Sequence, residues 1–346
     1  MEERMKVLVT GGLGFIGSHT VIKLIEAGHQ VVIIDNLFNS KPDVVDRIDK
    51  IVGVKPKVFI QDVCDKDKLM EIFKAEKPDA VIHFAGYKAV GESCQKPLMY
   101  YRNNIDSALS VLECMMENEC KNLVFSSSAT IYGETDKMPI TELSPRKEAT
   151  NPYGQTKVMI ERIIEDVCKV NPDFNAALLR YFNPIGAHPS GLLGEDPNGL
   201  PNNLLPYINK VATGELDHLN VFGNDYPTVD GTGVRDYIHV LDLAKGHVLA
   251  LKKLENGCGL FVCNLGTGKG TSVLEMVSAY EKATGVKIKY EIKPRRAGDV
   301  AESYAATNKA KEELGFECDY TILDACKHGY EFQKANKVEL KCTKNN

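Results

Sequence analysis

The chain has 346 residues, of which 43% are hydrophobic and 26% charged, so it can bury a large core in one big domain or two smaller ones. Its formal net charge is −5 at pH 7 and its basic residues are spread along the chain, which argues against nucleic acid as a partner. No stretch reaches the roughly 18 apolar residues of a membrane-spanning helix, and no signal-peptide core precedes the first strand-like segment. We therefore expect a cytoplasmic protein whose ten cysteines are mostly reduced.

Through the first 180 residues, short apolar runs alternate with segments of helical period. The predicted strands are KVLVT at 6–10, QVVIID at 30–35, KVFIQD at 57–62, DAVIHFAG at 79–86, NLVFSSS at 122–128 and AALLRY at 176–181. Between the fourth and fifth of these runs, Leu109, Leu112 and Met116 follow i, i+3 and i+4 spacing and predict a helix over 97–118. Such alternation is typical of βαβ units, so we predict an α/β fold with a Rossmann-type, doubly wound parallel sheet.

After residue 182 this rhythm breaks. The stretch GAHPSGLLGEDPNGLPNN is rich in glycine, proline and asparagine, as loops that wrap a ligand often are. Helical patterns return at 271–284 and 308–314. We predict a first domain over 1–182, with a later segment near 230–265 returning to it, and a smaller C-terminal α/β substrate domain over 183–346.

A glycine-rich turn follows the first predicted strand. In TGGLGFIGSH, Gly11 and Gly14 would let the backbone approach a pyrophosphate at a helix N-terminus, and Gly17 would let the helix pack on the strand. Asp35 ends the second strand 18 residues after Gly17, close to the roughly 20 residues expected for the acid that binds the adenosine ribose. Its charge would repel a 2′-phosphate, so we expect NAD rather than NADP. Asp62, at the end of the third strand, either bonds the adenine or caps the following helix.

The heptapeptide NPYGQTK places Tyr153 and Lys157 on one face of a predicted helix. The spacing alone does not decide their role, since Tyr330 and Lys334 share it. Tyr153 differs because it follows Ser128, which ends the fifth strand and should face the ligand crevice of an open α/β sheet. A nearby lysine favours a phenolate, so we predict a general base that acts beside NAD; the plainer alternative is a helix with a solvated lysine.

The glycine motif, the triple serine and the Y-x-x-x-K pattern resemble those of the extended short-chain dehydrogenase/reductase superfamily. Within it the chain is similar, over nearly its whole length, to the UDP-sugar 4-epimerases. The matching blocks are VTGGLGFIGSHT, VIHFAGYKAVGES, LVFSSSATIYG, TNPYGQTK, LLRYFNPIGAH, GLPNNLLPY, NVFGNDYPTVDGTGVRDYIHV and NLGTG. This resemblance implies NAD-dependent interconversion of UDP-galactose and UDP-glucose through C4 oxidation, rotation of the 4-keto sugar and re-reduction, by a homodimer without a metal.

The resemblance also implies residue roles. Tyr153 would take the proton of the sugar 4-hydroxyl, Ser128 would bond the same oxygen, and Lys157 would bind the nicotinamide ribose and lower the pKa of the tyrosine. The residues implied for NAD binding are Gly11, Gly14, Phe15, Ile16, Gly17, Asp35, Asn36, Asn39, Ser40, Asp62, Val63, Phe84, Ala85, Gly86, Lys88, Asn103, Ser126, Tyr153, Lys157 and Phe182. Those implied for the UDP-sugar are Lys88, Ser128, Ala129, Thr130, Tyr153, Asn183, Asn202, Asn203, Leu204, Asn220, Val221, Phe222, Arg235, Tyr237, Arg296, Asp299 and Ser303.

Elementary chemistry supports part of the substrate set, because Arg235 and Arg296 are suited to bind the oxygens of a diphosphate bidentately. Ser303 falls where related enzymes carry either a bulky tyrosine or a small residue against the sugar 2-substituent. A small serine leaves room for an N-acetyl group, so we predict that UDP-N-acetylglucosamine and UDP-N-acetylgalactosamine are also accepted.

Other functions stay open to different degrees. A 4,6-dehydratase is disfavoured because Ser128 is followed by Ala129 and Thr130 rather than by carboxylates. A UDP-glucuronate epimerase or decarboxylase remains an alternative, as does a net oxidoreductase, which would have to exchange its nicotinamide at each turnover. A non-catalytic NAD-binding regulator is the alternative from another class, and the intact Ser128, Tyr153 and Lys157 argue against it.

Overall fold

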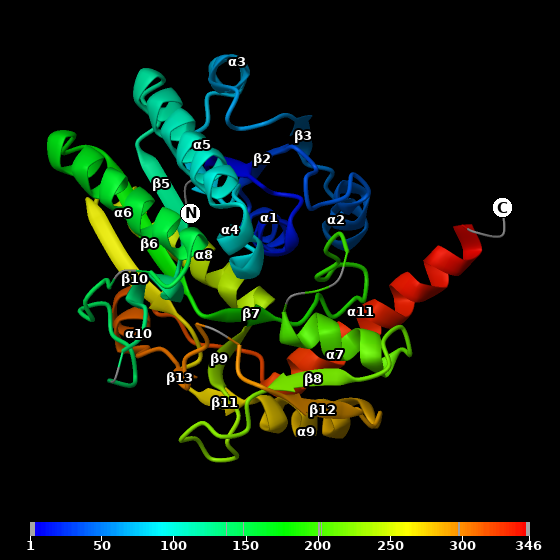
Figure 1. Cartoon of the computed structure of the whole chain (residues 1–346). Helices are drawn as coiled ribbons and strands as arrows, with labels where there is room; N and C mark the ends of the chain where they lie inside the picture. The colour runs from blue at the N-terminus through cyan, green and yellow to red at the C-terminus, as the bar shows by residue number, and fades with distance from the viewer. Residues whose placement is uncertain are drawn as a thin grey trace.

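A computed structural model describes residues 4–135, 137–147, 149–199, 201, 203–296 and 298–343, and gives the backbone alone at 338–343. Its centre is a parallel sheet of seven strands in the order β10-β6-β5-β4-β1-β2-β3 (Figure 1). The strands are β1 (Lys6–Thr10), β2 (Gln30–Asp35), β3 (Lys57–Ile60), β4 (Ala80–His83), β5 (Asn122–Ser128), β6 (Asn175–Tyr181) and β10 (Leu260–Leu265). The strand order reverses between β1 and β4, which is where such sheets form a ligand crevice.

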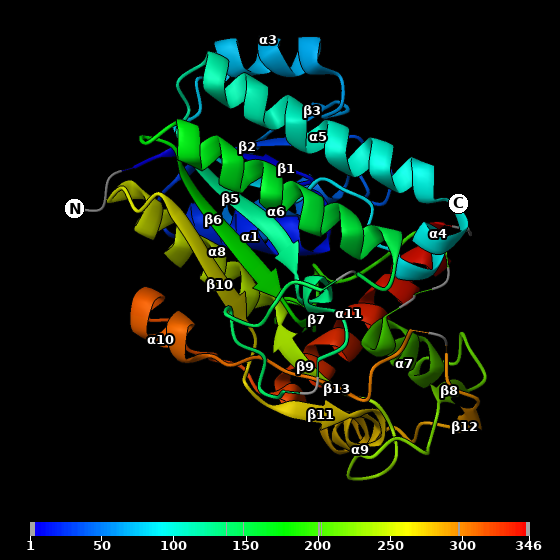
Figure 2. The ribbon, with the colours of Figure 1, turned by 60° about the vertical axis from the view of Figure 1, so that its left-hand side comes forward.

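Helices cover both faces of this sheet, as its apolar strands require. One face packs against three helices, two from the start of the chain and one from much later: α1 (Phe15–Glu26), α2 (Val44–Val52) and α8 (Val240–Glu255). The other face packs against α3 (Lys66–Glu76), α5 (Pro97–Glu117) and α6 (Pro152–Val170). In Figure 2, α5 and α6 run across the sheet and α3 lies above them. The predicted Rossmann-type α/β fold is confirmed.

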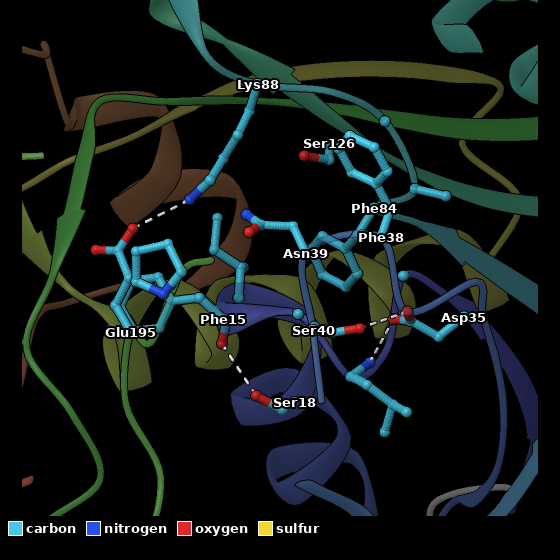
Figure 3. Close-up of a pocket in the computed structure, with 18 of the residues that line it drawn as sticks. Phe15, Ser18, Asp35, Phe38, Asn39, Ser40, Phe84, Lys88, Ser126 and Glu195 are labelled. Carbon is cyan, nitrogen blue, oxygen red and sulfur yellow. Dashed lines mark hydrogen bonds and ion pairs between the residues drawn. The ribbon is translucent and has the colours of Figure 1, made fainter. Parts of the chain in front are cut away.

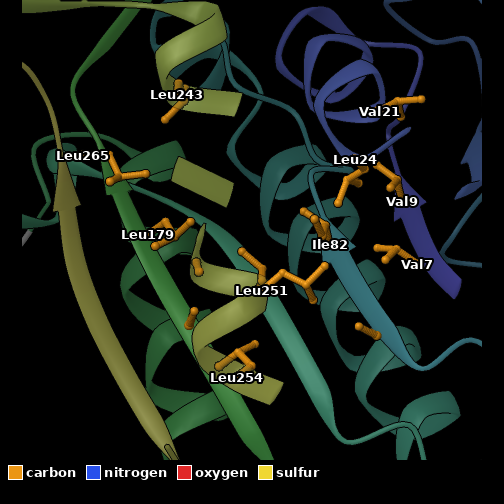
Figure 4. Packing of buried hydrophobic residues seen from close by; sticks show 14 of the residues in the cluster. Val7, Val9, Val21, Leu24, Ile82, Leu179, Leu243, Leu251, Leu254 and Leu265 are labelled. Atoms are coloured by element: carbon orange, nitrogen blue, oxygen red, sulfur yellow. The ribbon is translucent and has the colours of Figure 1, made fainter. Parts of the chain in front are cut away.

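The alternation of side chains along a strand is visible in β1. Val7 and Val9 belong to the core on the α1 and α8 side (Figure 4), whereas Leu8 belongs to the core on the α3, α5 and α6 side. Leu24 of α1 and Leu251 of α8 meet in the first of these cores. Because β1 is buried on both faces, its sequence is a continuous apolar run rather than an alternating one.

Two predicted strands end earlier than expected. The run at 57–62 stops at Ile60, and the run at 79–86 narrows to residues 80–83. The residues that follow leave the sheet and line the cavity described below. After β4 the run continues as Phe84, Ala85 and Gly86, and a sequence pattern does not distinguish such a ligand-facing loop from a longer strand.

A smaller α/β unit lies beside the carboxyl edge of the main sheet, in the lower part of Figure 1. Its β9 pairs with β7, β11 and β13, and β8 pairs with β12. The strands are β7 (Asn183–Ile185), β8 (Leu219–Phe222), β9 (Val234–His239), β11 (Gly270–Ser272), β12 (Tyr290–Lys293) and β13 (Glu302–Ser303). The helices of this unit and the remaining short ones are α4 (Val90–Gln95), η1 (Ala129–Tyr132), α7 (Leu204–Ala212), α9 (Val273–Thr284), α10 (Asn308–Leu314) and α11 (Ile322–Thr343).

The chain crosses between the two units more than once. After β7, α7, β8 and β9 it returns to the main sheet, where α8 packs on α1 and β10 pairs with β6. Within the described residues, every helix falls short of the length and apolarity that a bilayer crossing demands.

Candidate active site

The turn between β1 and α1 leaves no room for side chains. Gly11 has a φ of +67°, and a Cβ there would lie 2.9 Å from the backbone nitrogen of Ala85. A Cβ on Gly17 would lie 2.3 Å from the carbonyl oxygen of Gly11. Gly14 precedes the helix without a side-chain cap, so the first amides of α1 stay open to a ligand. This turn fits a bound pyrophosphate, since helix N-termini attract anions.

A cavity of about 330 Å³ lies at the carboxyl edge of the main sheet. Its lining combines residues that end or follow the strands β1 to β6 with others from α5, α6 and the loop after β7, and it includes every residue predicted for NAD binding. Of the residues predicted for the UDP-sugar, Lys88, Ser128, Tyr153, Asn183 and Asn203 line the same cavity. The structure therefore brings the predicted cofactor residues and the predicted catalytic residues into one space.

Asp35 is 6% exposed and ties two loops of the cavity together (Figure 3). Its carboxylate accepts hydrogen bonds from the Leu13 amide at 3.0 Å, the Leu37 amide at 2.9 Å and the Ser40 hydroxyl at 2.6 Å. Asp35 thus holds both the glycine turn and the loop after β2, in addition to facing the predicted ribose position.

Asp62 does not cap a helix. Its Oδ1 accepts from the Cys64 amide at 2.8 Å and its Oδ2 from the Asn36 side chain at 3.2 Å. The cap of α3 is Asp65, which accepts from the Lys68 amide. The helix-cap interpretation of Asp62 was wrong, because the helix begins three residues later than that role requires, and Asp62 instead lines the cavity.

Tyr153 and Lys157 lie on the first turns of α6. Asn151 caps this helix by accepting from the Gly154 amide at 2.9 Å, and a proline occupies the first helical position. The Lys157 ammonium donates to the Ser126 carbonyl at 2.6 Å and lies 5.9 Å from the centre of the Tyr153 ring. The Ser128 hydroxyl, which accepts from the Thr130 amide and hydroxyl at 3.2 and 3.0 Å, faces the same phenol.

Burial dominates the ionisation of this pair when no ligand is bound. It lowers the pKa of Lys157 to about 8, against an opposing effect of the Glu161 carboxylate. It also raises the pKa of Tyr153, and the hydrogen bond with Ser128 only partly offsets this. The phenol is therefore protonated at neutral pH in the free protein. Burial therefore opposes the effect predicted for Lys157, because it disfavours a charged phenolate.

The second Y-x-x-x-K pair lies elsewhere. Tyr330 is on α11, where its ring packs edge-on against Tyr280 at 6.1 Å and Lys334 lies 4.7 Å from its centre. Lys334 also pairs with Glu331 at 3.1 Å. Neither Tyr330 nor Lys334 lines the cavity, so the fold separates two pairs that share one spacing.

A second group of predicted residues gathers in the smaller unit. Arg296 bonds Asp299 at 2.9 Å and lies 4.8 Å above the Phe222 ring. Burial raises the pKa of Tyr237 to about 12, and the charges of Arg235 and Arg296 oppose that rise, which places both guanidinium groups near this phenol.

The other predicted substrate residues have varied surroundings. Ser303 stands opposite Arg235 in the pairing of β13 with β9, and the amide oxygen of Asn220 is buried without a hydrogen-bond partner among the described residues. Val221 is 1% exposed and belongs to the core of the smaller unit, so only its backbone is available to a ligand. Leu204 begins α7, Ala129 begins η1, and Asn202 lies outside the described residues.

The sequence interpretation missed the acidic residues of the loop over the cavity. Glu195 accepts from the Lys88 ammonium at 3.2 Å (Figure 3) and from the Asn203 side chain (Nδ2) at 2.7 Å. Asp196 pairs with Lys41. The glycine- and proline-rich composition predicted a ligand-wrapping loop here but gave no reason to single out its carboxylates.

Comparisons with known proteins agree on one group. A model of the NAD dependent epimerase/dehydratase family matches residues 7–266. UDP-glucose 4-epimerase of Mus musculus is 53% identical over 337 residues, covering 96% of this chain and 97% of that protein. The structure of UDP-glucose 4-epimerase from Stenotrophomonas maltophila, with bound NAD and formylated UDP-arabinopyranose, has a TM-score of 0.95 and 46% identity and covers 97% of this chain and 100% of its own. The structure of UDP-glucose 4-epimerase from Bifidobacterium longum, in complex with NAD+ and UDP, has a TM-score of 0.92 and 51% identity. The match covers 96% of this chain and 99% of that one.

Proposed function

Because the chain belongs to the NAD dependent epimerase/dehydratase family, we propose that it interconverts UDP-galactose and UDP-glucose at C4 of the hexose. The observation that carries this proposal is the meeting of Ser128, Tyr153 and Lys157 in one cavity with a glycine turn that fits a pyrophosphate. The cofactor is NAD, which when bound supplies a hydride acceptor and donor at C4, so that the sugar can be oxidised, turned about its diphosphate link and reduced on its other face.

The protein's own residues supply the acid and base chemistry. We assign to Tyr153 the removal of the 4-hydroxyl proton and its later return, because its phenol lies in the cavity beside the Ser128 hydroxyl. Ser128 holds the reacting oxygen. Lys157 favours the phenolate, and a ligand that excludes water strengthens that effect by lowering the local dielectric constant.

The remaining predicted residues divide into two binding regions. We assign the cavity residues around the glycine turn, Asp35 and Asp62 to NAD, and the group around Arg235 and Arg296 to the UDP part of the substrate. Two positive side chains near a buried tyrosine favour this choice, since a diphosphate needs charge-assisted donors. Lys88 and Asn203 both donate to Glu195, and we place the meeting point of the two binding regions at these residues.

We assign residues 1–182 to an NAD-binding Rossmann domain, to which a segment near 230–265 returns, and residues 183–346 mainly to nucleotide-sugar binding. The pairing of β10 with β6 and the packing of α8 on α1 support that return. We also place the enzyme in the cytoplasm, which the nine free cysteines of the described residues support.

We further propose a homodimer formed through α5 and α6. Leu109 of α5 is 38% exposed and Met159 of α6 is 39% exposed, and a groove of about 360 Å³ runs between the two helices. Its lining mixes apolar and charged side chains: Lys66, Leu109, Leu112, Glu113, Met116, Glu117, Ile163 and Val167. Exposed apolar residues gathered in this way favour a protein partner over water.

The test is to incubate the purified protein with UDP-galactose, without added oxidant or reductant, and to follow UDP-glucose by chromatography. Conversion is expected, and Tyr153→Phe should lower its rate by about 10²- to 10⁴-fold, the usual contribution of a positioned base. UDP-N-acetylglucosamine is offered in parallel, and turnover of UDP-galactose alone would contradict the wider specificity proposed from Ser303. Accumulation of an oxidised sugar together with an equal amount of NADH would indicate a net oxidoreductase instead.

A further inference from the structure

Three side chains of α6 face the end of β5 at intervals of four residues. Tyr153 meets the Ser128 hydroxyl, and Lys157 donates to the Ser126 carbonyl at 2.6 Å. One turn further along the helix, Glu161 accepts from the Ser127 hydroxyl at 2.6 Å. The three successive serines of β5 therefore each engage one turn of the helix that carries the proposed base.

Glu161 is fully buried, with 0% of its side chain exposed. Its carboxylate accepts from Arg180 of β6 through Nε at 3.0 Å and Nη2 at 2.7 Å, and from Arg146 at 3.3 Å. Together with the Ser127 hydroxyl these donors satisfy both carboxylate oxygens, so the buried charge is compensated. An apolar pair of similar volume would often be as stable as such a buried ion pair, so stability alone does not account for it.

The network continues away from the cavity and holds Arg180 in place. Arg180, which is 4% exposed, donates through Nη1 to the Tyr132 hydroxyl at 2.9 Å. Tyr132 in turn donates to Asn264 of β10 at 2.6 Å. Glu161 is thus fixed against three adjacent strands of the sheet, and a rotation or slide of α6 would break several hydrogen bonds at once.

We propose that Glu161 is a positioning residue of the reaction: through Ser127 it locks α6 to the end of β5, so that Tyr153 and Lys157 keep their places beside Ser128 and the Ser126 carbonyl. This inference rests on the proposed function and assigns Glu161 no contact with substrate or cofactor. It is specific to Glu161 and Ser127, whose side chains bond each other rather than Tyr153, Lys157 or Ser128.

The charges around Lys157 favour the same arrangement. Glu161 and Tyr153 face it from α6, and His83 faces it from β4 with a pKa lowered to about 3, mainly by burial. His83 is therefore neutral, and the nearby anion that favours the ammonium form of Lys157 is Glu161. Arg180 and Arg146 face Glu161 itself, at 2.7 and 3.3 Å from its carboxylate.

The test uses the full chain with Ser127→Ala, which removes one hydrogen bond and leaves the Glu161 and Arg180 pair intact. We expect kcat for UDP-galactose to fall about 10- to 100-fold, the usual worth of a hydrogen bond to a charged group, with KM and NAD content within about twofold of the wild type. Glu161→Gln and the variant that carries both substitutions complete a double-mutant cycle. Both substitutions weaken the hydrogen bond between Ser127 and Glu161, so their effects on kcat should be less than additive in the double variant.

Ser93→Ala is the matched control. Ser93 is equally buried and donates to the Val90 carbonyl at 2.6 Å, and it takes no part in the network around Glu161. It should keep kcat within about twofold. A second readout needs no turnover: the ring-carbon chemical shift of Tyr153, assigned in labelled protein with Tyr153→Phe, should move in Ser127→Ala and stay in Ser93→Ala.

The outcomes separate the two proposals. An unchanged kcat and an unchanged Tyr153 resonance in Ser127→Ala would overturn the positioning role while the wild type still converts UDP-galactose. A wild type that fails to convert UDP-galactose would count against the proposed function, and the Tyr153 resonance would then still decide whether Ser127 and Glu161 hold the tyrosine in place.

Discussion

At the scale of single residues, the balance between burial and charge decides how Tyr153 works. Burial raises the pKa of its phenol, and Lys157 lies close enough, at 5.9 Å from the ring centre, to oppose this once water is excluded. A unit charge at about 5 Å in a medium of dielectric constant near 20 contributes roughly 3 kcal/mol. The reactive state therefore depends on the ammonium group of Lys157 as much as on the phenol.

Lys157→Met should accordingly lower kcat/KM at pH 7 by about 100-fold or more. Without the cation, the already raised pKa of Tyr153 rises further, so the phenolate fraction at neutral pH drops. Raising the pH restores phenolate, and the activity of the variant relative to the wild type should climb between pH 7 and 10. Profiles of kcat/KM against pH for UDP-galactose measure both effects.

Lys334→Met is the matched control, because Lys334 has the same spacing from a tyrosine but lies on α11 away from the cavity. It should leave kcat/KM unchanged across the pH range. A Lys157→Met variant whose relative activity stays flat with pH would show that Lys157 acts on ligand binding alone.

The residues that the sequence allowed us to predict are those tied to a recognisable local pattern. The glycines follow from a strand and helix junction, and Tyr153 follows from its place behind a capped helix start. Glu161 and Glu195 have no such pattern, since a buried carboxylate looks like any surface glutamate until its partners are known. Arg180 lies 19 residues from Glu161, and Lys88 lies 107 residues from Glu195. Only the fold brings these partners to the two glutamates.

At the scale of elements, the loop after β7 is bonded to the loop after β2 on the cofactor side of the cavity. Asp196 pairs with Lys41, and Asn198 bonds the Asn39 side chain at 3.0 Å and the Phe38 carbonyl at 3.1 Å. These contacts therefore join the loop after β2 to the loop after β7 across the cavity mouth, although the two loops lie about 160 residues apart in the sequence. This arrangement favours retention of NAD through many turnovers.

Breaking the contacts between these two loops should speed NAD release. In Asp196→Asn combined with Asn198→Ala, the ion pair and the Phe38 contact are lost, each worth about 0.5–1 kcal/mol, so release should become about 5- to 30-fold faster. The rate is measured by diluting the NAD-loaded protein and following bound NAD by rapid filtration, while kcat with saturating NAD stays within about twofold.

Asp46→Asn provides the control, because Asp46 forms a similarly exposed ion pair with Lys55 outside the cavity. Its NAD release should match that of the wild type. Equal release from the wild type and the double variant would show that the loop contacts play no part in retention.

Element boundaries show where sequence periodicity is reliable. The helix predicted at 97–118 exists as α5, yet the stripe used to predict it is only partly buried: Leu112 is 5% exposed and Leu109 is 38% exposed. Most of the buried face runs through Tyr100, Val111 and Met115. Periodicity identified a helix because both faces carry apolar residues, and it could not tell the face that packs on the sheet from the face left outside.

At the scale of the whole molecule, that outer face bears on assembly. A face of α5 and α6 that combines exposed leucine and methionine with a groove is the surface we propose for the homodimer. A symmetric contact of two such helices from each copy would bury it as helix bundles bury their interiors.

Leu109→Glu should therefore yield a monomer, since it places an unpaired charge at the centre of the proposed contact. Light scattering coupled to size-exclusion chromatography measures the mass in solution. Leu143→Glu is the control, because Leu143 is 95% exposed and lies outside both helices, and it should stay dimeric. A dimer that survives Leu109→Glu would place the contact on another surface.

The last strand to join the main sheet sets the order in which the protein can be completed during synthesis. β6 receives its outer neighbour only from Leu260–Leu265, long after its own residues have left the ribosome. Until then the nascent chain carries an open strand edge of the kind that pairs with other chains. The sheet that contains the glycine turn is therefore complete only after most of the rest of the chain has been made.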